Sequence, residues 1–189
     1  MAGQYIERPL RPGRRAPCMY PLLRHLLLAL FLLAGALSAH AQSALDQAQT
    51  HWYAGRQTQA VEALEAALAT EPRQAKLRFA LAWMRQERGE LEAGERLLRS
   101  LLEEFPDHAE AHNNLAVILA QRGDLDPARL LLERAVQLQP EHAQAQENLG
   151  DLLLRLAQRA YLNASKSSAH AHVQLKLRQL APMLQDPKR

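Results

Sequence analysis

The chain has 189 residues, of which 48% are hydrophobic and 23% are charged, and its formal net charge is +3. Residues 1–41 hold five arginines and one glutamate, a charge of +4, so residues 42–189 carry only −1. The basic balance therefore belongs to the N-terminal segment and gives no reason to expect nucleic-acid binding. The single cysteine, Cys18, also lies there, which excludes disulfides, thiolate metal sites and a cysteine nucleophile from residues 42–189.

The first 41 residues have the order of a secretory signal. Five arginines precede a 12-residue apolar run, Leu26–Leu37, and small residues at Ala39 and Ala41 follow it. The run is short for a bilayer-spanning helix. We expect cleavage after Ala41 and a periplasmic mature chain, with retention as an inner-membrane anchor as the alternative. Met19 is an alternative start that would give a leader of ordinary length. Lipid anchoring would require a cysteine at the cleavage point, and Cys18 lies before the apolar run instead, so we do not expect a lipid anchor.

A 34-residue period runs through the rest of the chain. It is kept by three glycines and by three prolines that follow them: Gly55, Gly89, Gly123, Pro72, Pro106 and Pro140. Small residues and leucines recur at fixed distances after each glycine: Ala60, Gly94 and Ala128, then Leu64, Leu98 and Leu132. A period of this length is typical of a two-helix unit. We expect an array over 42–164, with units at about 41–74, 75–108, 109–142 and 143–164.

The turn residues predict where the helices end. Each glycine is expected to close a first helix in the left-handed conformation, and each proline to end a second helix. Asp126 followed by Pro127 predicts an N-cap with proline at the first helical position. No window shows the period-2 alternation of strands, so the predicted class is all-α.

The third unit carries the repeat most clearly, with NNLAVILAQRGDLDPARLLLERAVQLQP from Asn113 to Pro140. This stretch resembles the tetratricopeptide repeat family. The resemblance implies an α-solenoid of three full helix pairs plus an atypical fourth unit and a C-terminal capping helix. The tryptophan usual near each repeat start is replaced by Ala44, Arg78, His112 and Gln146. The stretch HAQAQENLGDLLLRLAQRAY is similar to repeats of proteobacterial envelope proteins, some of them coupled to peptidoglycan-modifying domains.

The C-terminal part departs from the repeat. Ala157 stands where the earlier units have glycine, so the helix is expected to continue to about Asn163 before a break at 165–168. Apolar residues at Val173, Leu177, Leu180 and Leu184 then predict one buried face, with Pro182 kinking or shortening the helix. We interpret residues 165–189 as a capping helix with a basic tail; a partner-binding tail is the alternative. The tail is called basic because residues 152–189 have a net charge of +6, whereas residues 42–151 have a net charge of −7.

The family arrangement implies that the first helix of each unit lines a concave groove. The resemblance assigns to it Asp46, Gln49, Trp52, Tyr53, Lys76, Phe79, Ala80, Trp83, Gln86, Glu110, Asn113, Asn114, Val117, Gln121, Glu147, Asn148, Asp151 and Arg155. Asn114 and Asn148 are one period apart, and their amides can donate to and accept from a peptide backbone. The alternative is that these asparagines hydrogen-bond across neighbouring repeats.

Aromatic residues gather in the first two units, at Trp52, Tyr53, Phe79 and Trp83. Such side chains commonly anchor a bound peptide, although packing between the two units would also explain them. The carboxylate clamp of some family members needs lysine, asparagine and arginine on this face. Leu45, Gln49, Ala80 and Glu110 stand at several of those places. We therefore expect no strong preference for an acidic C-terminal tail.

Residues with catalytic or metal-binding chemistry are sparse. His108 and His112 are four apart, near Asp107 and Glu110, a spacing typical of metal ligands on a helix. However, His142 repeats the position of His108 one period later, which favours a structural role in the turn between units. We expect no metal, no cofactor and no enzymatic activity.

The sequence therefore predicts an exported adaptor that binds a protein or extended-peptide client in a cell-envelope assembly. One alternative is a periplasmic chaperone for a secreted client, such as an apocytochrome or a pilus subunit. Another is binding of an anionic polymer or lipid surface through the basic C-terminus. Nucleic acid is not an expected partner, and membrane contact is expected only through a retained signal or the basic tail.

Overall fold

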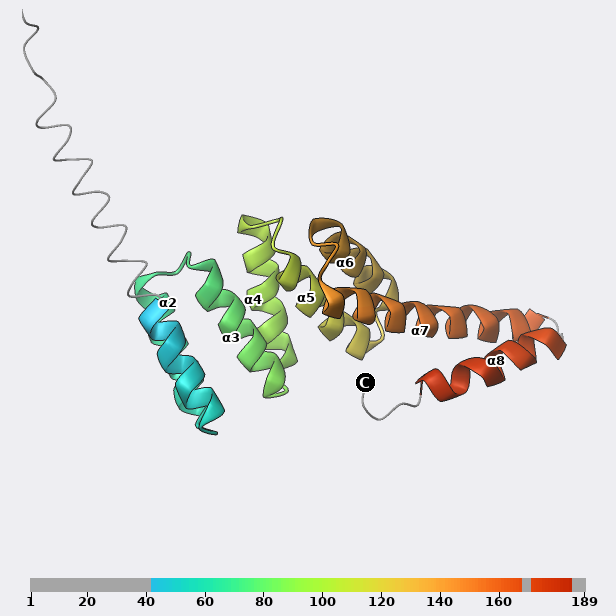
Figure 1. Cartoon of the computed structure of the whole chain (residues 1–189), viewed down its shortest axis with the longest axis horizontal. Helices are drawn as coiled ribbons and strands as arrows, with labels where there is room; N and C mark the ends of the chain where they lie inside the picture. The colour runs from blue at the N-terminus through green and yellow to red at the C-terminus, as the bar shows by residue number, and fades with distance from the viewer. Residues whose placement is uncertain (1–41, 168–170, 185–189) are drawn as a thin grey trace, which may run out of the picture. The chain divides into compact units, whose positions relative to one another are not determined.

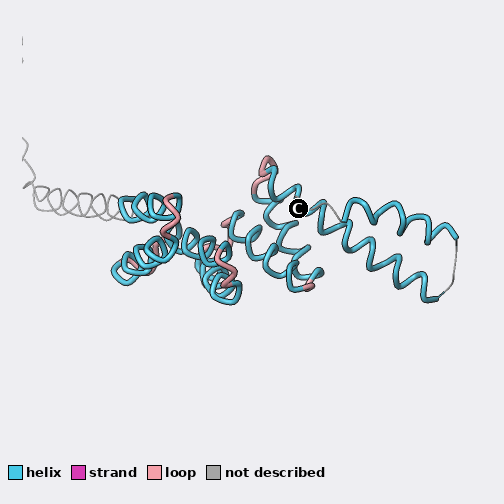
Figure 2. The backbone as a smooth tube through the Cα atoms, turned by 90° about the horizontal axis from the view of Figure 1, so that it is seen from below, coloured by secondary structure: helices cyan, strands magenta, loops and turns pink. Residues whose placement is uncertain are grey.

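The computed structural model describes residues 42–167 and 171–184. The expected signal segment, with Cys18 and Met19, lies outside them. Residues 42–53 are helical, and the helices that follow are α2 (Gln57–Thr70), α3 (Ala75–Glu87), α4 (Leu91–Glu104), α5 (Ala109–Arg122), α6 (Leu125–Leu138), α7 (Ala143–Ser167) and α8 (Ala171–Leu184). The described residues form helices joined by short turns, without a strand (Figures 1 and 2). The predicted all-α class is confirmed.

The periodic glycines and prolines occupy equivalent turns. Gly55, Gly89 and Gly123 have φ values of 76°, 76° and 94°, the left-handed region in which a Cβ atom is unfavourable. At each of these positions the first helix of a unit gives way to the second within a few residues. The three prolines stand one residue after the C-caps of α2, α4 and α6, where a helix cannot continue. Both turn predictions are confirmed.

The start of α6 differs from the prediction. The helix begins at Leu125, and its N-cap is Asp124, whose side chain makes no capping bond. The Asp124 carboxylate instead accepts a hydrogen bond of 2.6 Å from Arg122. Asp126 and Pro127 lie inside the first turn, and both Asp126 oxygens accept from Arg159. The prediction of Asp126 as N-cap was wrong because the helix starts two residues earlier, and Asp126 is instead used in an ion pair with α7.

The core lies between the stacked helix pairs. Leu64, Leu98 and Leu132, the leucines of the 34-residue pattern, are 0%, 0% and 1% exposed. The small residues of the pattern are buried as well, and a Cβ atom on Gly94 would lie only 3.1 Å from the Ala82 carbonyl oxygen. This close approach packs α3 against α4 within one unit. The buried cluster around Leu98 also includes Leu115 and Leu132 of the next unit, so each unit needs its neighbour to bury its apolar face.

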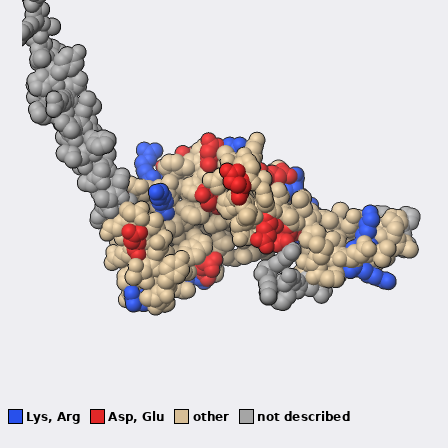
Figure 3. Space-filling model, viewed as in Figure 1, with Lys and Arg blue, Asp and Glu red and all other residues tan. Residues whose placement is uncertain are grey.

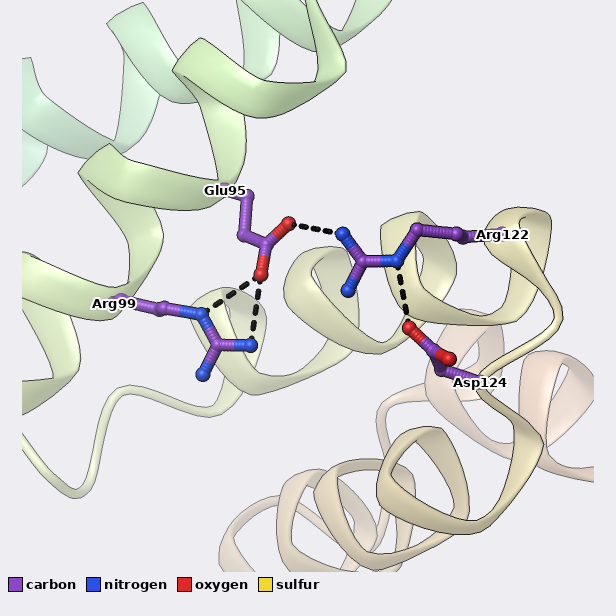
Figure 4. A network of polar contacts seen from close by, with 4 residues as sticks. All are labelled: Glu95, Arg99, Arg122 and Asp124. Carbon is purple, nitrogen blue, oxygen red and sulfur yellow. Dashed lines mark hydrogen bonds and ion pairs between the residues drawn. The ribbon is translucent and has the colours of Figure 1, made fainter.

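Ion pairs connect consecutive units at the surface. Glu95 on α4 accepts hydrogen bonds from Arg99 on the same helix and from Arg122 at the end of α5, and Arg122 also binds Asp124 (Figure 4). The Glu95 side chain is only 14% exposed, so this network joins the second and third units more tightly than an open surface pair would.

The C-terminal hairpin, α7 with α8, departs from the regular unit. α7 has 25 residues and continues to Ser167, four residues beyond the expected end near Asn163, so the expected boundary between residues 164 and 165 falls inside this helix. α8 turns back along α7 and, among the described helices, contacts α7 alone (Figures 1 and 2). Val173 is buried in this contact, and Pro182 lies in the last turn of α8.

Candidate functional site

The first helices of the units lie on the inner side of the array. α3 contacts α5, and α5 contacts α7, although a second helix lies between each pair in sequence. Among the described helices, α2 does not contact α4, and α4 does not contact α6. The helices are thus closer together on the side of α3, α5 and α7, which makes that side concave.

Trp52 and Trp83 meet where the first two units join. Their ring centroids are 5.2 Å apart with an interplanar angle of 53°, a tilted arrangement favourable for aromatic pairs. Both side chains are partly buried. The pair packs one unit against the next, as the packing alternative predicted, and the exposed part of each ring remains available on the surface.

The other predicted residues of the first two units are less closely grouped. Phe79 stacks against His108, with centroids 5.1 Å apart at 32°. Tyr53 is 81% exposed at the end of the first helical segment, and Lys76 is exposed at the start of α3. Neither Tyr53 nor Lys76 belongs to an aromatic pair, and neither lines the clefts between the described helices that are discussed below.

The predicted asparagines form one hydrogen-bonded group. Asn148 on α7 donates to the side-chain oxygen of Asn113 over 2.8 Å, and Asn113 donates to Asn114 over 3.0 Å. Gln144 donates to Asn148 over 3.2 Å. Asn113 is 5% exposed, while Asn114 and Asn148 are partly exposed. The bond that crosses from one repeat to the next therefore joins Asn148 to Asn113, whereas the sequence paired Asn148 with Asn114.

A cleft of about 330 Å³ lies beside these asparagines. Five of the predicted residues line it, from α5 and α7: Val117, Gln121, Asn148, Asp151 and Arg155. Its apolar wall is completed by Ala120, Leu132, Leu152, Leu154, Met183 and Leu184. The structure thus brings together these five predicted residues of the third and fourth units. Their amides and charges border an apolar surface, as in sites that hold a peptide by its backbone and one side chain.

Met183 and Leu184 were not among the predicted site residues. They enter the cleft because α8 folds back along α7 and its last turn reaches the concave side. The sequence indicated an apolar face on α8 that includes Leu184. Met183 lies outside that pattern, and only the direction of the hairpin brings it to the cleft.

The histidines serve as helix caps. His108 Nδ1 accepts from the Ala111 amide over 3.3 Å, and His142 Nδ1 accepts from the Ala145 amide at the same distance, one period later. They satisfy amides that the first turns of α5 and α7 leave without intrahelical partners. In the described part of the chain no group of three or more histidine, cysteine, aspartate or glutamate side chains could hold a metal ion. No described helix has the length and apolar character required to cross a membrane.

The place of the expected tryptophan in the second unit is taken by a buried charge. Arg78 is 6% exposed; it lies 3.2 Å from a carboxylate oxygen of Glu104 and donates to the Ser100 carbonyl. An arginine stem can fill the space of a ring while its guanidinium binds the end of α4.

Comparison with known proteins decides the family. The tetratricopeptide repeat profile matches residues 45–93 and 84–140, which together make up about half of the chain. The chain belongs to the tetratricopeptide repeat family. No curated protein matches its sequence. The family assignment accounts for the 34-residue period, the left-handed glycines and the concave row of first helices.

Solved structures of the same fold are distant in sequence. The first TPR of Spaghetti (RPAP3), bound to an HSP90 peptide, has a TM-score of 0.59 at 16% identity, with 64% of this chain and 95% of that one covered. The second TPR domain of human RPAP3, in complex with an HSP70 peptide, has a TM-score of 0.56 at 19% identity. The match covers 61% of this chain and 97% of that domain. An O-GlcNAc transferase mutant from Thermobaculum terrenum has a TM-score of 0.58 at 21% identity. The match covers 69% of this chain and 26% of the transferase. At these identities the likeness concerns the fold.

Proposed function

We propose that this chain is an exported, non-enzymatic tetratricopeptide repeat scaffold that binds an extended segment of another protein within the cell envelope. The observation that carries the proposal is the cleft of about 330 Å³ on the concave side, where Asn148, Asp151 and Arg155 border an apolar wall. A surface of this kind suits an extended chain, because amides bind its backbone and the apolar wall receives a side chain.

The first two units offer a second contact region. Tyr53 is 81% exposed, and the Trp52–Trp83 pair and Phe79 are partly exposed. Rigid aromatic side chains bury a large area at little cost in conformational entropy. The peptides held by the two RPAP3 domains support a peptide or protein ligand for this fold. We expect no preference for an acidic C-terminal carboxylate, since the family's clamp positions are not matched here.

Export and location in the envelope are supported by the order of charges and apolar residues in 1–41. N-terminal sequencing of protein recovered from the envelope fraction tests this part directly. A mature chain beginning at Gln42 is expected. Recovery of the uncleaved chain from the cytosol would contradict it.

Site-specific crosslinking tests the binding function. A photo-reactive residue replaces Gln121, which is exposed and lines the concave cleft, and in a matched protein it replaces Leu130, which is 59% exposed on the second helix α6. In the native envelope we expect one defined protein to crosslink from position 121 and not from position 130. Equal crosslinking from both positions, or crosslinking from 130 alone, would overturn a concave binding site.

A further inference from the structure

The second half of α7 is an addition to the repeat array. α5 ends after 14 residues at the left-handed Gly123, whereas α7 has 25 residues and passes through Ala157 without a turn. The additional turns of α7 pack against α8. Their side chains have no counterpart in a regular two-helix unit, whose first helix ends earlier. We call the described residues 155–167 and 171–184 of this hairpin the extension.

The extension carries charge of one sign. It contains Arg155, Arg159, Lys166, Lys176 and Arg178 and not one aspartate or glutamate. Figure 3 shows this end of the described molecule with basic side chains and without acidic ones. Internal pairing removes only part of the charge. Arg159 binds Asp126 through two bonds of 2.8 and 2.7 Å, and the Lys176 ammonium lies 5.1 Å from the centre of the Tyr161 ring. Arg155 and Lys166 form no ion pair with any described residue.

The cations lie along a surface that continues the concave cleft. A second cleft of about 350 Å³ separates the start of α6 from α7. It is lined by Leu125, Arg155, Gln158, Arg159, Leu162, Asn163 and Lys166, so it shares Arg155 with the first cleft. Arg155, Arg159, Leu162 and Lys166 are spaced by four, three and four residues and therefore occupy one face of α7.

α8 adds a cation to the same side. Met183 lines the first cleft, and Lys176 precedes it by seven residues, two helical turns, so both lie on one face of α8. Arg178, two residues after Lys176, points away from that face. The concave side of the hairpin is thus bordered by cations on both helices.

We propose that the concave face of the extension, which carries Arg155, Arg159, Lys166 and Lys176 but not Arg178, binds an acidic, extended segment of the protein client that occupies the groove. This inference rests on the proposed function and adds the chemistry of the client: side-chain carboxylates next to the segment held at Asn148 and Arg155. Arginine and lysine pair strongly with carboxylates when the site is partly shielded from water. The recessed surface and its continuity with the groove favour a chain segment over a flat bilayer, and the positive charge of the extension disfavours a second copy docked hairpin to hairpin.

Peptide binding by variants of the purified protein tests the proposal. The probe is a fluorescent peptide of alternating glutamate and leucine with an amidated C-terminus, and its glutamine counterpart is the neutral comparison. We expect Lys166→Glu and Lys176→Glu each to weaken binding of the glutamate peptide about tenfold at low ionic strength. Arg178→Glu, the matched control with the same change of net charge on the opposite face, should bind like the unmodified protein.

Three results would overturn the proposal: equal weakening by all three substitutions, equal affinity for the glutamate and glutamine peptides, or binding to phosphatidylglycerol vesicles without binding to the peptide. Crosslinking from position 121 separates this failure from failure of the groove. If only the extension proposal is wrong, the Lys166→Glu chain binds the acidic peptide normally and still crosslinks to its client. If the groove proposal is wrong, crosslinking from position 121 is absent or no stronger than crosslinking from position 130 in every variant.

Discussion

Asn148 donates a hydrogen bond of 2.8 Å to the side-chain oxygen of Asn113, 35 residues earlier, and so joins the fourth unit to the third. Because Asn113 is 5% exposed and also donates to Asn114, its amide is the centre of the group. A buried amide with two partners stabilises the interface between repeats and holds the neighbouring amides in fixed orientations on the concave side.

Removal of that central amide should destabilise the array. We predict that Asn113→Ala lowers the free energy of unfolding by about 1–2 kcal/mol, because Asn148 and Asn114 lose a partner. Gln144→Ala, which removes an exposed amide bonded to Asn148, should cost less than about 0.5 kcal/mol. Urea denaturation followed by circular dichroism compares the two. Equal costs would show that the Asn113 bonds do not hold the repeats together.

The aromatic residues of the first two units should divide into packing and binding roles. A double-mutant cycle on Trp52 and Trp83 should give a coupling of about 1 kcal/mol in unfolding free energy, as tilted aromatic pairs do. Tyr53→Ala should leave stability unchanged, because the side chain is 81% exposed, and should reduce client crosslinking from position 121. Unchanged crosslinking would remove Tyr53 from the binding surface.

Two glycine substitutions should have opposite effects. Gly123→Ala should destabilise the protein by about 1 kcal/mol, because residue 123 has φ 94°. Gly150→Ala should stabilise it by about 0.5–1 kcal/mol, since that glycine is helical and a Cβ atom there would meet no atom within 4 Å. Thermal unfolding of the two variants measures the difference. A stabilising Gly123→Ala would contradict the turn geometry.

The Glu95 network should make stability depend on pH. Partial burial raises the pKa of Glu95, but hydrogen bonds from Arg99 and Arg122 outweigh that effect and hold the pKa below its ordinary value of 4.5. The contribution of the carboxylate is therefore complete above that value and is lost as the pH falls through the lowered pKa. Glu95→Gln should cost about 1 kcal/mol at neutral pH and progressively less in acid. Denaturation curves across this range test it, and a cost independent of pH would argue against an ionic contribution.

The regular part of the fold could be predicted because its turns use residues of special backbone chemistry. Glycine at positive φ and proline after a C-cap mark helix ends independently of tertiary contacts, so the positions of Gly55 and Pro72 define a unit without knowledge of its neighbours. The leucine pattern, represented by Leu64 and Leu98, likewise follows from helical spacing alone.

Other features depend on tertiary structure and could not be predicted in this way. Asp126 is a residue type that commonly caps helices, and Pro127 follows it. However, α6 starts at Leu125, and the Asp126 carboxylate binds Arg159 of the next helix instead. The pairing of Asn148 with Asn113 rather than Asn114 depends on the exact rotation between two units. Met183 reaches the cleft only because α8 reverses direction, which no local pattern specifies.

The most direct test of a concave binding site is amide hydrogen exchange of the protein with and without the client identified by crosslinking at position 121. We predict slower exchange in α3, α5 and α7, the helices of the concave side, and unchanged exchange in α2 and α4. Protection confined to α2 and α4 would contradict binding in the groove.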